Sequence, residues 1–245
     1  MNSEQMRFRK ISGVVANLHI TQDKENFVQT RTDQAVGGAA AVGLAVGGLA
    51  GAATGAVLSS SDAADSVDFF TCTVDGQPVW GRFGIVSFKD GENVEAVGEN
   101  TRQGFEAYAI TRPSDRTVWM YPHCSRGTKA HVRFSIASIL LLSIVGALCM
   151  QLVFWLASDK SLEGGVAIFL VVAFLTSVIG FALVGSFVAT RFMKFAHQSN
   201  DIFAALEFEN PAEVDLLKRL RAARKSFTSE DHLRYSPHVR WVYKY

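Results

Sequence analysis

The chain has 245 residues, of which 49% are hydrophobic and 19% are charged, and its formal net charge is +1. This composition excludes an intrinsically disordered chain, which combines few apolar residues with a high net charge. The near-neutral balance gives no overall electrostatic reason to expect nucleic acid as a partner.

Residues 10–20, the first element along the chain, have the pattern of a β-strand. Their apolar positions include Ile11, Val14 and Ile20. The residues before them are polar and charged, and no apolar core of about 7–15 residues follows the N-terminus. We therefore expect no cleavable signal peptide, so any insertion into a membrane depends on internal segments.

Residues 35–60 consist almost wholly of Ala, Gly and Val, and small residues recur in them at every fourth position. The row includes Gly43, Gly47, Gly51 and Gly55. On a helix these residues share one face, and a face without side chains lets another helix approach closely. In water each glycine would destabilise such a helix by about 1 kcal/mol relative to Ala. We therefore expect a glycine zipper that packs in a membrane or in an assembly.

Other interpretations of residues 35–60 stay open. A glycine-rich run can be a flexible linker, or a soluble helical hairpin folded back on its own domain. As a permanent third span, the run would place Arg126, Lys129 and Arg133 on the outer side, against the positive-inside rule. A conditional or re-entrant insertion agrees better with these charges.

Residues 67–122 contain a series of short strand patterns separated by turns. Asp75-Gly76 lies between two β-forming runs, and Asp-Gly in this setting is a strong hairpin signal. The pattern predicts a small β-barrel or sandwich of the OB or SH3 kind, formed by residues 1–34 and 62–130. The fold class is therefore an α+β membrane protein in which the glycine-zipper segment interrupts the β-domain.

Four aromatic residues of this β-domain raise the possibility of a nucleic-acid site. Trp80, Trp119, Tyr108 and Tyr121 could stack on bases, but such binding also needs a positively charged groove. Residues 61–100 have eight acidic and two basic residues. We therefore expect no nucleic-acid partner, and place these aromatic rings in the core or against a membrane surface.

Two long runs without charge predict a transmembrane hairpin over residues 136–190. Residues 136–157 and 164–190 carry no charged side chain, and as helices they would be roughly 33 and 40 Å long, against about 30 Å of hydrocarbon. The short connector, residues 158–163, makes the two helices antiparallel neighbours. Gln151 either lines a pore or makes an interhelical hydrogen bond.

Basic residues flank the base of this hairpin on both sides: Arg126, Lys129 and Arg133 before it, and Arg191 and Lys194 after it. The connector has a single lysine between two acids. The positive-inside rule therefore predicts a multi-pass protein of the inner, cytoplasmic membrane with both termini in the cytoplasm.

Residues 191–245 predict cytoplasmic helices and a terminal strand. Asn210, Pro211 and Glu213 have the order of an N-cap, first helical residue and N3 acid. The helix after them is amphipathic and basic, and its polar face carries Lys218, Arg219, Arg221, Arg224 and Lys225. It lies either on an anionic membrane surface or against the β-domain. Residues 238–245 alternate like a strand that completes the sheet.

No pattern in the sequence predicts a catalytic, metal or cofactor site. Nucleophile elbows, phosphate-binding loops and metal-ligand pairs are missing from the sequence. His123 and Cys124 are neighbours in a strand-like stretch, so their side chains would point to opposite faces. We expect Cys72, Cys124 and Cys149 to be free and to behave as small apolar residues. The chain is therefore expected not to be an enzyme.

With these features together, the chain resembles the type VI secretion system effector family of Gram-negative bacteria, which are small membrane proteins. The resemblance covers the opening strand, the glycine-rich run, residues 68–83 (DFFTCTVDGQPVWGRF), the apolar hairpin and the terminal RWVYKY, residues 240–245. It implies secretion into a neighbouring cell and action at a membrane by pore formation. It implies no catalytic residues.

Two functions of different classes follow from these expectations. The first is a non-enzymatic effector that inserts into a target inner membrane and permeabilises it, as a homo-oligomer, because two or three helices enclose no channel. The second is an inner-membrane adaptor or immunity-type protein whose β-domain binds a protein partner. The partners expected are the lipid bilayer, further copies of the chain, and type VI secretion components or a cognate immunity protein.

Overall fold

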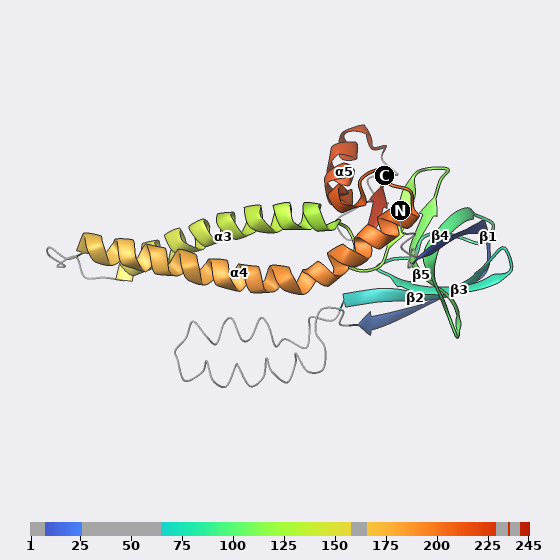
Figure 1. The fold of residues 1–245 in the computed structure, drawn as a ribbon, viewed down its shortest axis with the longest axis horizontal. Coiled ribbons are helices and arrows are strands. Elements are labelled where there is room, and N and C mark those ends of the chain that lie inside the picture. Colours follow the sequence, from blue (N-terminus) through green and yellow to red (C-terminus); the bar gives the residue numbers. More distant parts are fainter. Residues whose placement is uncertain (1–7, 26–64, 158–165, 229–234, 236–240) are drawn as a thin grey trace, which may run out of the picture.

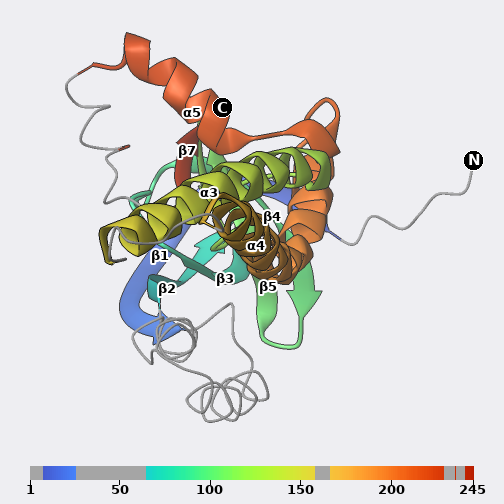
Figure 2. The same ribbon diagram turned by 90° about the vertical axis from the view of Figure 1, so that its left-hand side faces the viewer.

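The computed structural model describes residues 8–25, 65–157, 166–228, 235 and 241–245. The predicted zipper glycines, Gly43, Gly47, Gly51 and Gly55, lie outside the described residues. Figure 1 shows a β-domain from which two long helices, α3 and α4, extend side by side to one side of the molecule. Figure 2 looks along these helices and shows the strands arranged behind them.

The β-domain is a closed barrel of five strands, and two further strands extend its sheet. The predicted β-barrel is confirmed. Its strands are β1 (Arg9–Glu25), β2 (Asp65–Val74), β3 (Gln77–Phe83), β4 (Asn93–Thr101), β5 (Gly104–Arg112), β6 (Thr117–Met120) and β7 (Val242–Lys244). Their order is β3-β2-β1-β4-β5-β6-β7, and a parallel pairing of β3 with β5 closes five strands into the barrel. The predicted terminal strand is confirmed in β7, which pairs with β6.

A bend in β1 lets this one strand serve two sides of the barrel. Its first part pairs with β4 from Arg9 to Val14, and its second part pairs with β2 up to Glu25. The register shifts between Ala16 and His19. A bulge of this kind increases the local twist of a strand and bends it, which is what closure of a small barrel needs.

The predicted Asp-Gly hairpin between β2 and β3 is confirmed. Asp75 and Gly76 have φ angles of 50° and 79°, the left-handed pair of a two-residue type I′ turn. Val74 and Gln77 pair directly on either side of them. The turn therefore fixes the register of this ribbon, because a two-residue loop leaves no freedom to slip.

Aromatic side chains form the centre of the barrel. The rings of Phe70 and Phe83 stack at 5.0 Å, and Phe88 meets Phe70 edge-on at 5.4 Å and Trp119 at 5.3 Å. Trp119 is fully buried, and its indole N–H donates to Ser87 Oγ at 3.2 Å. Burying a side chain of this size contributes about 1.5–3 kcal/mol. The sequence predicted that this ring lies either in the core or against a membrane surface, and Trp119 lies in the core.

The helical part begins directly after β6. Its elements are α3 (Thr128–Ala157), α4 (Val166–Ala205), the short turns η2 (Pro211–Glu213) and η3 (Arg224–Ser226), and α5 (Leu216–Ala223). Both α3 and α4 are long and apolar enough to cross a membrane. Apart from Val14 and Ile20, every large hydrophobic side chain that is exposed in the described part of the chain lies on these two helices.

Candidate functional site

Small residues bring α3 and α4 into close contact along the hairpin. A Cβ atom added to Gly146 would lie 2.8 Å from the ring of Phe181, and one added to Gly185 would lie 2.9 Å from Ile139 Cγ1. Gly180 is different, because an added Cβ would meet nothing within 4 Å. Close approach through small residues is the usual packing mode of helices in a membrane. These two glycines were not singled out in the sequence, because they are isolated among large apolar residues.

One polar side chain joins the two helices within their apolar stretch. Gln151 Nε2 donates a hydrogen bond to the carbonyl oxygen of Leu170 at 2.6 Å. Of the two roles predicted for Gln151, the structure has the interhelical hydrogen bond. A hydrogen bond in such a setting satisfies a polar group that lipid could not.

Polar contacts hold the two helices together where they join the β-domain. Asn200 Oδ1 accepts from the Thr128 backbone N–H at 3.0 Å, and Asn200 Nδ2 donates to Thr128 Oγ1 at 3.0 Å. One turn further along α3, His131 Nε2 lies 3.1 Å from the carbonyl oxygen of Ala189. Because a carbonyl oxygen only accepts, Nε2 is the donor in this contact.

A second set of contacts ties the start of α3 to the C-terminal part of the chain. Arg126 Nε lies 3.1 Å from Asp215 Oδ2, and both side chains are more than four-fifths buried. The backbone N–H of Gly127 donates to Val214 O at 2.9 Å, and that of Leu216 donates to Ser125 O at 3.0 Å. We call this set of residues, 125–127 and 214–216, the junction.

The junction corrects the predicted start of the C-terminal helix. Asn210 stands at the N-cap position of a helical turn that begins at Pro211, as predicted, but its φ is 52°, its side chain makes no capping hydrogen bond, and Pro211–Glu213 form only a short 3₁₀ turn. The α-helix begins at Leu216, where Asp215 caps it by accepting from the Lys218 N–H at 2.9 Å. The prediction was wrong because Asp215 both caps α5 and binds Arg126, which a local pattern does not reveal.

The basic residues predicted at a membrane surface lie on and just after α5. The apolar side chains of α5, Leu216 and Leu220, are buried within the protein rather than presented to lipid. Of the two predicted positions for this helix, the structure has the one against the β-domain. The basic side chains on and just after this helix are exposed: Lys218, Arg219, Arg221, Arg224 and Lys225.

Two of these basic residues have defined contacts. The guanidinium carbon of Arg219 lies 5.1 Å from the ring centre of Phe208, and Arg224 donates to the carbonyl oxygen of Tyr235 at 3.4 Å. Arg224 also lines a cavity of the described part of the chain, whereas Lys218, Arg219, Arg221 and Lys225 do not. Arg224 is therefore the basic residue that the structure connects to a cavity.

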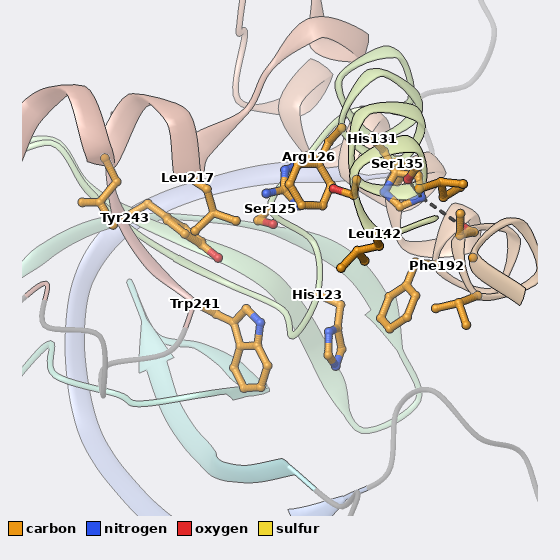
Figure 3. Close-up of a pocket in the computed structure, with 18 of the residues that line it drawn as sticks. His123, Ser125, Arg126, His131, Ser135, Leu142, Phe192, Leu217, Trp241 and Tyr243 are labelled. Carbon is orange, nitrogen blue, oxygen red and sulfur yellow. Dashed lines mark hydrogen bonds between the residues drawn. The ribbon is translucent and has the colours of Figure 1, made fainter. Parts of the chain in front are cut away.

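The cavity has a volume of about 820 Å³ and lies where α3, α4, α5 and β7 meet (Figure 3). His123, Arg126 and Trp241 lie on the side of the β-domain, and Leu142 and Phe192 come from the two long helices. Volumes of 300–1,000 Å³ are typical of ligand sites. Sequence reasoning missed this cavity because its lining residues come from six segments that no short pattern connects.

Two buried groups beside the junction, the Cys124 thiol and the Tyr243 hydroxyl, are held in their uncharged forms. Burial raises the pKa of the Cys124 thiol to about 12, and burial also raises the pKa of the Tyr243 hydroxyl. In the barrel, burial and then the charge of Asp90 raise the pKa of Cys72 to about 12. Thiols of this kind are poor nucleophiles at neutral pH. Among the described residues, no group of three or more His, Cys, Asp or Glu side chains could hold a metal ion.

Comparisons with known proteins give no match: no family model, curated protein or solved structure is similar to the chain. The interpretation of function therefore depends on the residues and geometry described above.

Proposed function

We propose that α3 and α4 cross an inner membrane as a hairpin, with the barrel and both termini on the cytoplasmic side. The exposure of apolar side chains on both helices supports this, because that surface is costly to leave in water. Basic side chains at the barrel end of the hairpin support the orientation: Lys129, Arg133, Arg191 and Lys194. Trp155, exposed near the other end of α3, suits the opposite interface.

We further propose that the protein is a non-enzymatic type VI secretion effector that permeabilises a target inner membrane. The observation that carries this proposal is where the glycine-rich run is attached. Glu25 pairs with Asp65, so residues 26–64 leave and re-enter the barrel at one point. Figure 1 shows this end of β1 pointing in the same direction as the two long helices. The predicted zipper is thus tethered on the side of the barrel where the membrane surface would lie.

Permeabilisation in this proposal requires several copies of the chain. The two helices pack against each other at Gly146 and Gly185, and two helices alone enclose no channel. A channel therefore has to form between hairpins, and the row of small residues from Gly43 to Gly55 offers a surface for close helix contacts.

The test is a membrane-potential measurement in cells that express the chain with or without a signal for export to the periplasm. We expect depolarisation by the wild-type chain, and its loss in Gly47→Leu and Gly51→Leu, which fill the groove. Ala45→Leu adds comparable bulk off the row and should keep the activity. Full depolarisation by both glycine variants, or none by the wild-type chain on either side, would refute the permeabilising function.

The anchoring of the barrel favours a second candidate, an inner-membrane adaptor or immunity-type protein that binds a protein partner. Phe195, Ile202 and Phe203 of α4 are buried in the core cluster of the β-domain, so this helix would hold the barrel firmly at the membrane surface. The strand order is that of a five-stranded Greek-key barrel, a common binding module. In the membrane-potential measurement, this function predicts no change in potential. In a separate cross-linking experiment, it predicts that one specific protein is cross-linked to the barrel.

A further inference from the structure

The cavity at the junction has a polar end and an apolar end. Arg126, Arg224 and Tyr243 lie on the side of the junction, whereas the His123 ring packs among the rings of Phe192, Phe195 and Trp241. No Asp or Glu is among the described residues that line the cavity. The polar end therefore favours an anionic or strongly accepting group, because its arginine side chains carry only donors.

The two arginines have different freedom at this polar end. Arg126 is fixed, because its side chain pairs with Asp215 and lies over the ring of Phe134 at 3.8 Å. Arg224 is exposed at the rim, and among the described residues its side chain makes a long hydrogen bond to the carbonyl oxygen of Tyr235. Arg224 is thus the side chain that can turn onto an anionic group while Arg126 shapes the wall behind it.

The apolar end opens onto the surface of the hairpin. Leu142 and Val184 line the cavity and are nevertheless 66% and 47% exposed, so the cavity is open sideways between α3 and α4. From His131 to Leu142 the lining extends eleven residues along α3, or about 16 Å. The charge-free part of α3 begins at residue 136, so the lining from Ser138 to Leu142 lies in the apolar stretch and His131 lies at its basic end.

We propose that this cavity binds one anionic phospholipid, with its phosphate at Arg224 and an acyl chain between α3 and α4. The proposal rests on the proposed location of the hairpin in a bilayer. A soluble anion would leave the apolar end empty, and a neutral hydrophobic molecule would leave the arginine end unused. A phospholipid fits both, since basic pockets beside membrane helices suit lipid headgroups.

The test uses the full chain reconstituted into vesicles of phosphatidylcholine and phosphatidylglycerol at 3:1 and then extracted in mild detergent. Native mass spectrometry counts the lipids that each chain retains. Arg224→Gln removes the charge that meets the phosphate, and Ser138→Trp fills the cavity from α3. Lys225→Gln is the matched control, because Lys225 is exposed beside Arg224 and does not line the cavity.

We expect the wild-type chain to retain one phosphatidylglycerol. The ratio of lipid-bound to free chain should fall about tenfold in Arg224→Gln, the loss of one charge-assisted hydrogen bond, and to near zero in Ser138→Trp. Lys225→Gln should stay within about twofold of the wild-type ratio. Equal retention of both lipids, or equal losses in Arg224→Gln and Lys225→Gln, would overturn the site. A chain that sits in the membrane without retained lipid refutes this site alone, whereas a chain that needs no detergent refutes the membrane proposal as well.

Discussion

Gly127→Ala is expected to detach the C-terminal part of the chain from the base of α3. An added Cβ would lie 2.2 Å from the carbonyl oxygen of Pro211 and 2.7 Å from the backbone of Ala212. Both neighbours are backbone atoms, which cannot turn away as a side chain could. The φ of Gly127 is not in the left-handed region, so the cost of the substitution comes from this contact and not from the conformation of the residue.

The size of the effect follows from the contacts that must separate. Inserting a methyl group into a packed site costs about 1–3 kcal/mol. If residues 211–216 move away instead, two backbone hydrogen bonds of the junction are lost, at about 0.5–1.5 kcal/mol each. The pair of Arg126 and Asp215 is lost with them. We therefore expect the docking of this segment to weaken by about 2–4 kcal/mol, or roughly 30-fold to several hundredfold in its opening equilibrium.

Hydrogen exchange of the purified full chain measures this opening directly. Amides of α5 and of residues 214–216 should exchange faster in Gly127→Ala by the factor above, while those of β2 and β3 stay unchanged. Gly180→Ala is the control, since its added Cβ meets nothing within 4 Å. Unchanged exchange in α5 would refute the reasoning, and an equal increase in the barrel strands would show that the junction is not a separate unit of stability.

Three further predictions concern the hairpin, the barrel and the environment of the helices. Gly185→Leu should overpack the contact between α3 and α4 and lower the stability of the detergent-solubilised chain to thermal unfolding by about 1–3 kcal/mol. Gly180→Leu should leave this stability nearly unchanged. Similar losses in both variants would contradict the packing of the two helices described above. Burial opposes ionisation of Asp115, but hydrogen bonds from Arg112 outweigh it and lower the pKa of this carboxyl. The stability that this carboxylate contributes should therefore be complete above about pH 5 and be lost as the pH falls below about 4. In this pH range, the midpoint of urea unfolding should depend less on pH for Arg112→Met than for the wild-type chain. Cys149 is exposed on α3, and a thiol in lipid does not form the reactive thiolate. In sealed vesicles a charged, impermeant maleimide should therefore not label it, and rapid labelling by this reagent would place this helix in water.

Those features of the fold that depend on local chemistry were predictable from the sequence. The Asp75-Gly76 turn specifies a hairpin because only a few residues accept two successive positive φ angles. The charge-free runs of α3 and α4 likewise predict two long helices, since length and composition alone decide that question. Strand pairings between neighbours in sequence followed from these turns.

The junction and the cavity were not predictable, because they depend on contacts between distant parts of the chain. Arg126 and Asp215 are 89 residues apart, and neither residue stands out in its own segment. The same distance explains why the α-helix begins at Leu216 and not at Pro211, since Asp215 caps this helix and also pairs with the distant Arg126. Local propensity contributes about 1 kcal/mol at such a position, which the junction contacts exceed.

The length of α4 has a mechanical consequence for the proposed function. This helix runs without interruption for 40 residues, or about 60 Å, from the far end of the hairpin to Ile202 and Phe203 in the core of the β-domain. A continuous helix fixes the direction of both ends. If its apolar part lies in a bilayer as proposed, the barrel cannot rotate freely above the surface, and the ends of β1 and β2 keep facing the membrane (Figure 1). The glycine-rich residues between these strands are then held near the lipid at a high effective concentration, so their insertion needs no rearrangement of the barrel.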